Sequence, residues 1–236
     1  MAVSTAIILA GGLGTRLRSA VPDLPKPMAP VSGRPFLEHQ FDYWIAQGVR
    51  NLVVSVGYRR EVIMEHFGAA YRGANIHYAI EETPLGTGGG LLLAAAGLPP
   101  DELCLVLNGD TFFEVSLLQL AAFHEQKHAD WSFALFRAEE SGRYMGMDVA
   151  ADGHLRSLKS GAGTPGRLAN GGVYLLRPAL LQTGGIATGT RCSLEDELLP
   201  ALLARGSCFY GMESPGRFID IGVPEDYRRC GELLPA

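Results

Sequence analysis

Residues 6–17 read AIILAGGLGTRL, and this stretch decides how the chain begins to fold. Its first part, Ala6–Ala10, is a continuous apolar run that stops at Gly11-Gly12. An unbroken run of this kind is typical of a strand buried on both faces, as in a parallel sheet. Glycines directly after such a strand let backbone N–H groups approach an anion without hindrance from a Cβ. The stretch therefore predicts a buried strand that ends in a ligand-binding loop.

The same alternation of patterns continues downstream. Further strand patterns lie at Leu52–Val56 and Leu103–Leu107, which are again typical of buried strands, and at Ile76–Ile80 and Trp131–Arg137. Helical patterns lie between them, at Pro35–Gln47, Glu61–Phe67, Gly88–Ala96 and Leu117–Lys127. Strands that alternate with helices predict βαβ units, and hence an α/β fold with a doubly wound, mostly parallel, Rossmann-like sheet.

The pattern changes between Met145 and Leu176, where short strand signals are separated by Gly-rich turns. This segment predicts a small β-rich portion. A helix over Leu194–Ala204, strands near Cys208–Met212 and Phe218–Ile219, and a final helix over Pro224–Cys230 follow it. The chain shows no internal repeat and no linker, so we expect a single domain over residues 1–236.

Composition narrows the class of protein. Of the 236 residues, 47% are hydrophobic and 19% are charged, which indicates a globular chain. The net charge of −5 argues against nucleic acid as a partner held by bulk electrostatics. No apolar run approaches the roughly 18 residues of a membrane span, and the N-terminus lacks the basic stretch of a signal peptide. The sequence predicts a cytoplasmic protein without a membrane partner, and it does not indicate an oligomeric state.

The four cysteines do not form a pattern that binds metal. They are Cys104, Cys192, Cys208 and Cys230, and none of them belongs to a C-x-x-C pair. We interpret them as reduced, structural thiols.

Two cations stand in or near the glycine-rich loop. Arg16 lies inside it, and Lys26 follows between two prolines that restrict the backbone around it. The dinucleotide fingerprint is excluded, because Leu17 occupies the position of its third glycine, and the P-loop is excluded because no Gly-Lys-Ser/Thr follows. What remains is a loop whose cations reach a bound phosphate, or a tight turn with solvated cations.

At this point the sequence resembles a known family. LAGGLGTRL at residues 9–17, followed by PKP at 25–27, looks like the signature of the sugar-1-phosphate nucleotidylyltransferases. Further motifs follow in the order of that family: LGTGG at 85–89, NGD at 108–110, NGG at 170–172, Glu195-Asp196 and DIG at 220–222. The resemblance implies transfer of a nucleotidyl group from a nucleoside triphosphate to a sugar 1-phosphate, with release of pyrophosphate.

The resemblance also implies a nucleotide site. Its positions here are Leu9, Ala10, Gly11, Gly12, Gly14, Thr15, Glu81, Gly86 and Thr87. Arg16 would hold the triphosphate and stabilise the departing pyrophosphate, and Lys26 would hold the sugar phosphate. Asp110 and Asp220 would hold a Mg²⁺, which makes Asp110 both a catalytic residue and a metal ligand. The alternative for each aspartate is a turn at the end of a strand.

The sugar pocket implied by the resemblance contains Asn170, Gly171 and Glu195. Glu195 could instead be a first-turn helix charge that follows a Ser193 cap. Arg143 and Lys159 either reach the sugar phosphate or are solvated cations.

The base and the sugar follow from finer features. The Glu81 carboxylate only accepts hydrogen bonds, so it suits guanine, whose N1–H and N2–H₂ are adjacent donors; this favours GTP. Glu81 and the adjacent Glu82 could instead form a solvated surface pair. The region around Lys26 and the NGG motif most resemble the D-glycero-α-D-manno-heptose-1-phosphate guanylyltransferases. The alternatives are an N-acetylmuramate-1-phosphate uridylyltransferase and a non-catalytic NDP-sugar-binding protein, although the joint presence of Arg16, Lys26, Asp110 and Asp220 favours an enzyme.

One motif points to a different chemistry. HEQKH at residues 124–128 matches the zinc-protease pattern H-E-x-x-H. It lies at the end of a predicted helix, whereas a protease needs it in mid-helix beside a cleft with a third ligand downstream. We interpret it as a solvated helix end.

Overall fold

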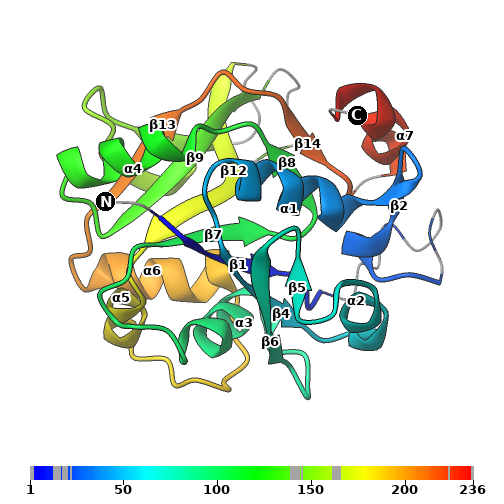
Figure 1. The fold of residues 1–236 in the computed structure, drawn as a ribbon. Helices are drawn as coiled ribbons and strands as arrows, with labels where there is room; N and C mark the ends of the chain where they lie inside the picture. The colour runs from blue at the N-terminus through cyan, green and yellow to red at the C-terminus, as the bar shows by residue number, and fades with distance from the viewer. Residues whose placement is uncertain are drawn as a thin grey trace.

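The computed structural model of the chain describes residues 3–12, 17, 21, 23–138, 144, 146–160, 166–222 and 224–234 (Figure 1). The side chains of residues 159, 160, 224, 232 and 233 are outside this description. None of the helices within these ranges is long and apolar enough to cross a membrane.

Four parallel strands form the first half of the sheet. They are β1 (Thr5–Leu9), β4 (Asn51–Val56), β6 (Ala74–Ile80) and β7 (Cys104–Asn108), and their order is β7-β1-β4-β6. Thr5 pairs with Asn51 on one side and with Cys104 on the other, so β1 is hydrogen-bonded along both edges. The predicted doubly wound, mostly parallel α/β fold is confirmed.

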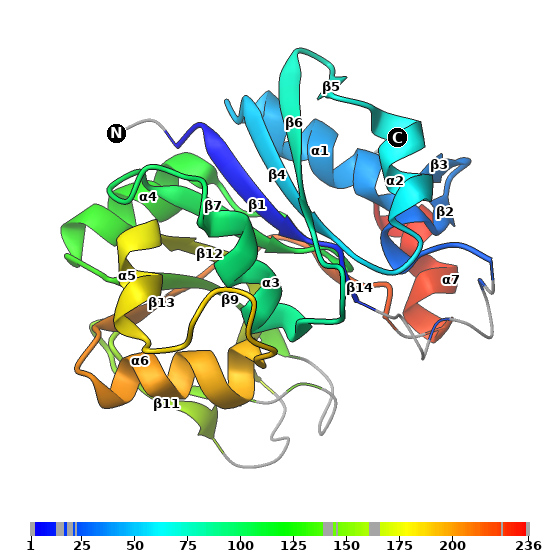
Figure 2. The same ribbon diagram turned by 90° about the horizontal axis from the view of Figure 1, so that it is seen from below.

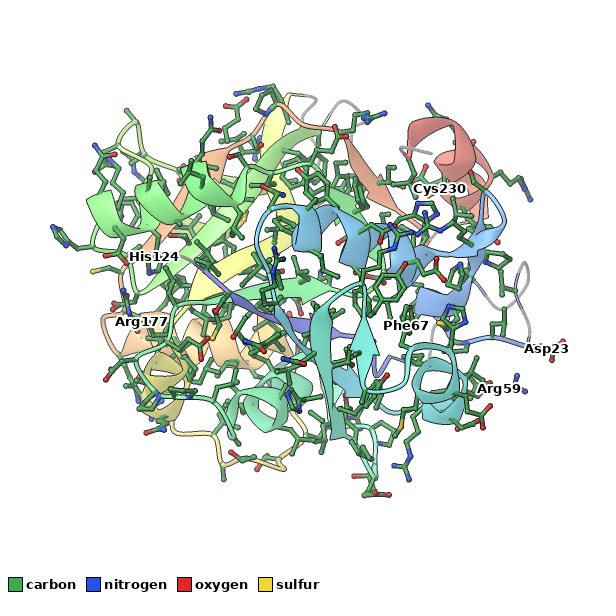
Figure 3. The ribbon with its side chains drawn as sticks, viewed as in Figure 1. Asp23, Arg59, Phe67, His124, Arg177 and Cys230 are labelled. Carbon is green, nitrogen blue, oxygen red and sulfur yellow. The ribbon has the colours of Figure 1, made fainter. Side chains whose placement is uncertain are left out.

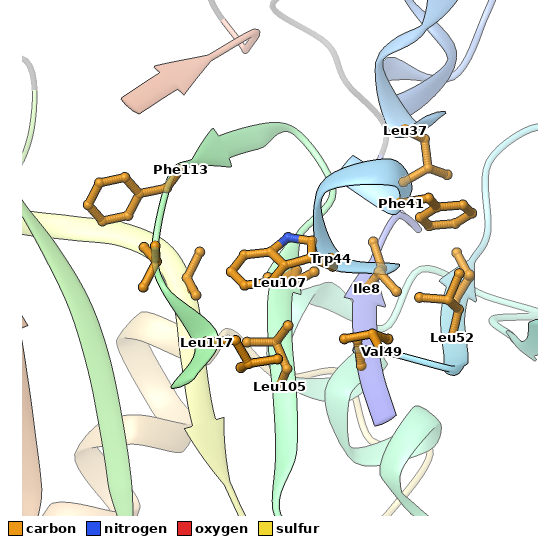
Figure 4. Close-up of a cluster of buried hydrophobic side chains, with 14 of the residues drawn as sticks. Ile8, Leu37, Phe41, Trp44, Val49, Leu52, Leu105, Leu107, Phe113 and Leu117 are labelled. Carbon is orange, nitrogen blue, oxygen red and sulfur yellow. The ribbon is translucent and has the colours of Figure 1, made fainter. Parts of the chain in front are cut away.

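Helices cover both faces of these strands (Figure 2). They are α1 (Phe36–Ala46), α2 (Arg60–Phe67), α3 (Gly86–Ala95) and α4 (Leu117–Gln126). Successive strand residues point to opposite faces, so β1 presents Ile8 to the cluster that contains Phe41 and Trp44 (Figure 4) and Ile7 to the cluster that contains Leu91. Burial on both faces explains why β1, β4 and β7 are nearly continuous apolar runs, whereas the first residues of β6 alternate between buried and exposed.

The β-rich portion extends the same sheet. Its strands are β9 (Trp131–Ala138), β10 (Gly146–Val149), β11 (Leu155–Ser160), β12 (Arg167–Leu176) and β13 (Phe209–Glu213). β12 is one long strand that runs antiparallel to β7 and to β9, and β13 adds to β9 in parallel. With β5 (Ala70–Tyr71) at the far edge, the sheet has ten strands within the described residues.

Smaller elements complete the architecture. Two short pairs lie outside the main sheet, β2 (Pro30–Val31) with β3 (Arg34–Pro35) and β8 (Thr111–Phe113) with β14 (Phe218–Asp220). The helical elements are the 3₁₀ helix η2 (Lys26–Met28), α5 (Pro178–Thr183), the π-helical turn η3 (Leu194–Leu198), α6 (Leu199–Ala204) and α7 (Pro224–Leu233). The helix expected over Leu194–Ala204 therefore begins as a π turn, capped by the Ser193 hydroxyl, which accepts from the Asp196 N–H at 3.1 Å.

The HEQKH segment corrects one prediction, because His124 is buried rather than solvated. Its side chain is 1% exposed, and its Nδ1 lies 2.9 Å from the Ser132 hydroxyl on β9. Arg177 approaches the ring from the other side and donates to Glu125 at 2.7 Å (Figure 3). The prediction failed because α4 turns His124 toward the sheet. Burial, with the charge of Arg177 nearby, lowers the pKa of His124 to about 4.

This buried histidine predicts how stability depends on pH. The folded chain binds the proton more weakly than the unfolded chain, whose histidine has a pKa near 6.5. Stability is therefore lost as the pH falls below about 6.5, and the loss levels off below about 4. We expect the wild type to lose about 2 kcal/mol more unfolding free energy than His124→Gln between pH 7 and pH 5, measured by urea denaturation. The exposed His77→Gln should follow the wild type, and equal losses in wild type and His124→Gln would contradict the assignment.

Candidate functional site

The carboxyl ends of the parallel strands meet at one edge of the sheet. There the Gly109 N–H donates to the Leu9 carbonyl at 3.0 Å, and the Ala10 N–H donates to the Ser55 carbonyl at 2.9 Å. A cleft of about 550 Å³ opens at this edge. Its described lining is Leu9, Ala10, Gly11, Gly12, Lys26, Pro27, Glu81, Pro84, Gly86, Thr87, Gly90, Asn108, Gly109, Asp110, Arg191 and Glu195. Ligands bind at this position in open α/β sheets.

Lys26 forms an ion pair with Asp110 in this cleft. The distance from Lys26 Nζ to Asp110 Oδ2 is 2.6 Å, and the two side chains are 16% and 35% exposed. Pro25 precedes the 3₁₀ helix η2 and Pro27 lies within it, while the Met28 N–H donates to the Pro25 carbonyl at 2.8 Å. The short helix and the two prolines hold the backbone of Lys26, so its ammonium is aimed into the cleft.

Asp220 reaches the same place from the other end of the chain. The pairing of β14 with β8 sets Asp220 opposite Thr111, and the Ile221 N–H donates to the Asp110 carbonyl at 3.0 Å. A Cβ on Gly222 would lie 2.6 Å from Asp220 Oδ1 and 2.7 Å from Lys26 Nζ. The structure thus brings Lys26, Asp110 and Asp220 together, although 194 positions separate the first from the last.

The two carboxylates fit a magnesium ion better than a transition metal. Mg²⁺ takes oxygen ligands and is usually bound by one or two carboxylates together with substrate phosphates. Asp110 and Asp220 supply such oxygens beside a cleft with room for phosphates. Among the described residues there is no group of three or more His, Cys, Asp or Glu side chains arranged for a metal.

Glu81 lies in the wall of the cleft and is 8% exposed. Its Oε1 accepts from the Ser55 hydroxyl at 2.8 Å, and its Oε2 accepts from the Leu85 N–H at 3.0 Å. The alternative of a solvated surface pair is wrong for Glu81, because burial removes it from solvent. Glu82 does lie at the surface, 77% exposed and 3.2 Å from Arg60.

The LGTGG motif joins helix α3 to the π turn η3. Gly86 has a φ of +74°, and the Gly88 and Gly89 N–H groups donate to the Cys192 carbonyl at 3.0 and 3.1 Å. Thr87 Oγ1 accepts from the Leu194 N–H at 3.1 Å and lies 3.3 Å from Glu195 Oε2. Besides lining the cleft, the motif therefore connects the start of α3 to the segment that leads into η3.

A second cleft of about 330 Å³ adjoins the first and shares Glu195 with it. Its described lining is Phe133, Met147, Leu158, Asn170, Glu195, Asp196 and Leu199. Asn170 is held in place, because its Oδ1 accepts from the Gly172 N–H at 3.0 Å and its Nδ2 donates to the Tyr174 hydroxyl at 2.8 Å.

The NGG motif forms a bulge in β12. Asn170 pairs with Leu135 and Tyr174 with Phe133, so four steps along β12 match two steps along β9. Gly172 has a φ of +71°, which favours glycine. A Cβ on Gly171 would overlap the ring of Phe113. Gly171, expected in the sugar pocket, packs against this ring and is absent from the described lining of both clefts.

Several expected site residues lie outside the described residues: Gly14, Thr15, Arg16 and Arg143, together with the side chain of Lys159. In the other direction, the structure adds Arg191, an exposed cation in the lining of the main cleft. An isolated arginine on a loop forms no periodic pattern, so nothing in the sequence singled it out except its place three residues before the helical stretch at Leu194.

The Nucleotidyl transferase family matches residues 5–235, and the chain belongs to that family, which confirms the resemblance of the motifs. The chain is 40% identical to the D-glycero-alpha-D-manno-heptose 1-phosphate guanylyltransferase of Aneurinibacillus thermoaerophilus, over 97% of each chain. It is 34% identical to the mannose-1-phosphate guanylyltransferase of Mycobacterium tuberculosis, over 95% of this chain and 62% of that one. The crystal structure of HddC from Yersinia pseudotuberculosis has a TM-score of 0.84 and 30% identity, over 98% of this chain and 99% of HddC.

The close contact between Gly86 and Cys192 predicts that adding one methyl group at Gly86 lowers the free energy of unfolding. A Cβ on Gly86 would lie 2.6 Å from the Cys192 carbonyl oxygen, whereas Gly189, with a φ of +85°, has open space around it. We expect Gly189→Ala to cost about 1 kcal/mol for the left-handed backbone alone. Gly86→Ala should cost roughly 2 kcal/mol more because of the overlap, measured by urea unfolding. Equal costs would show that the overlap relaxes freely.

Proposed function

We propose that the protein transfers GMP from GTP to D-glycero-α-D-manno-heptose 1-phosphate, giving GDP-heptose and pyrophosphate. The observation that carries this proposal is the Lys26–Asp110 pair beside Asp220, in a cleft at the carboxyl ends of the parallel strands. The full-length similarity to the Aneurinibacillus enzyme supports the choice of GTP and of the sugar. A nucleoside triphosphate substrate also supports a cytoplasmic location.

The reaction requires no general base. A sugar phosphate has a second pKa of about 6, so its oxygen is already largely deprotonated at neutral pH. That oxygen attacks the α-phosphorus, a new P–O bond forms, and the bond to the departing pyrophosphate breaks. The protein therefore contributes positioning and charge neutralisation.

The cations of the site have distinct places in this reaction. Lys26 is held at the carboxylate pair, where its ammonium would hold the sugar phosphate beside the α-phosphorus. Arg191 also lines the main cleft and would add a second positive charge against the phosphates. Arg16, in the glycine-rich loop, would hold the triphosphate and the departing pyrophosphate.

Asp110 and Asp220 would hold the Mg²⁺. When bound, the ion supplies positive charge to the phosphate oxygens and acts as a Lewis acid. The contact between Asp110 and Lys26 holds that carboxylate at the cleft, where it would take part in binding the ion.

The two clefts divide the substrates between them. Glu81 lies in the main cleft, where its carboxylate would accept from guanine N1–H and N2–H₂. The second cleft would take the sugar, with the Asn170 amide and the Glu195 carboxylate facing its hydroxyls. Glu195 borders both clefts, which is the position expected of a group near the join of the two substrates.

The first test measures pyrophosphate release with Mg²⁺, heptose 1-phosphate and each of the four nucleoside triphosphates. We expect release with GTP only. Release with UTP would contradict the assignment of the base and favour a uridylyltransferase. Release only with mannose 1-phosphate or N-acetylmuramate 1-phosphate would contradict the sugar, and silence with every pair would favour a non-catalytic NDP-sugar-binding protein.

Lys26 gives the sharpest prediction from this site. We expect Lys26→Met to lower kcat/KM by about a hundredfold to a thousandfold, because the reacting phosphates lose a positioned charge. The matched control is Lys127→Met, since Lys127 lies over the rings of Phe123 and Tyr210, away from the cleft lining. If Lys26→Met kept the activity of the Lys127→Met control, Lys26 would have no part in charge neutralisation.

A further inference from the structure

The carboxylate of Glu81 is held by one hydrogen bond to each of its oxygens. Ser55 Oγ donates to Oε1 at 2.8 Å and the Leu85 N–H donates to Oε2 at 3.0 Å. The Ser55 side chain lies at the end of β4 and is 0% exposed, and the Leu85 N–H stands at the start of α3. Strand β4 and helix α3 thus each supply one donor to the same carboxylate.

Glycines flank the same carboxylate on two sides. A Cβ on Gly11 would overlap Glu81 Oε1. A Cβ on Gly90, which lies inside helix α3, would stand 2.8 Å from Glu81 Oε1 and 2.9 Å from Ser55 Oγ. The carboxylate therefore fills the space between the glycine-rich loop and α3, and no side chain at either glycine could share it.

These contacts from Ser55 and Leu85 fix an orientation that the glutamate side chain does not fix by itself. The last torsion of a glutamate is broad, so a free carboxylate rotates about its own axis. Guanine offers two adjacent donors, N1–H and N2–H₂, and both are met only when the carboxylate plane matches the plane of the base. An ionised carboxylate accepts about four hydrogen bonds, and two of these positions remain after Ser55 and Leu85 have taken theirs.

We propose that Ser55 is a positioning residue that sets the selectivity for guanine by fixing the plane of the Glu81 carboxylate, with Gly90 keeping the space for it. The proposal rests on the proposed function, in which Glu81 faces the base. Ser55 itself stays behind Glu81, fully buried, and acts on the nucleotide through the carboxylate alone.

The test compares equilibrium binding of GTP and of ITP, the analogue that lacks the 2-amino group. We expect the wild type to prefer GTP. Ser55→Ala should weaken GTP binding about tenfold, because a carboxylate that is no longer fixed loses about the strength of one charge-assisted hydrogen bond to the base. ITP binding should weaken less, so the GTP/ITP ratio falls. A merely structural loss would weaken both nucleotides equally and leave the ratio unchanged.

Ser132→Ala is the matched control. Ser132 is also 0% exposed and also bonds one side chain, with 2.9 Å between its hydroxyl and His124, but it lies on β9, away from the cleft lining. Both variants lose a buried hydroxyl, so their unfolding free energies should fall together. Only Ser55→Ala should change the GTP/ITP ratio.

A second pair of variants keeps the test independent of the folding of Ser55→Ala. Gly90→Ala improves the helix propensity of α3 but pushes against Glu81 and Ser55, so it should also lower the GTP/ITP ratio. The control is Gly97→Ala. Gly97 lies just after α3, and a Cβ there would have no atom within 4 Å, so this variant should leave the GTP/ITP ratio unchanged.

The outcomes separate this inference from the proposed function. A wild type that binds GTP in preference to ITP, with the same preference in Ser55→Ala and Gly90→Ala, overturns the inference alone. A wild type that binds UTP more tightly than GTP, or binds GTP and ITP equally, overturns the guanine assignment and this inference with it. A ratio that falls in both variants and in neither control supports the inference.

Discussion

Parallel pairing of β1 with β4 and β7 is the constraint on which the rest of the structure depends. It places the ends of three strands side by side, so the loops that follow them must share one edge. Asp110 follows β7, Glu81 follows β6 next to β4, and the glycine-rich loop follows β1. Because these strands pair in register, the polar residues that follow their apolar runs emerge at the same edge of the sheet and form the site.

The charged side chains of the site are stabilised in two different ways. Lys26 pairs with Asp110 in a partly buried setting. Its positive charge offsets the repulsion between the neighbouring carboxylates of Asp110 and Asp220. Glu81 is stabilised differently, by two hydrogen-bond donors, and within the part of the chain that the structure describes no cation bonds to it. The two arrangements suit two tasks: charges that must exchange with a phosphate or an ion are left accessible, and a carboxylate that must keep one orientation is enclosed.

Much of this architecture was predictable from the sequence, for physical reasons. Continuous apolar runs and Gly or Pro punctuation give the parallel strands and their helices, and strand ends give the places of Asp110 and Asp220. The remainder depends on tertiary contacts. Gly-rich β12 resembles a series of turns until β7 and β9 pair with it on both sides. His124 resembles a solvated residue until α4 packs it on Ser132, and Arg191, a single cation on a loop, gives no pattern at all.

The bulge in β12 has a consequence for how this strand tolerates change. Because it adds two residues, an even number, the alternation of faces survives it: Ala169, Val173 and Leu175 all point into one core cluster, and Leu168, Tyr174 and Leu176 contact the other. Loss of one residue from Asn170-Gly171-Gly172 would exchange the two faces for the whole second half of the strand. Loss of two would keep the alternation of faces, at the expense of the contacts that the motif makes with the second cleft and with Phe113. A change of length within this motif therefore preserves the buried faces of β12 only when the number of residues gained or lost is even.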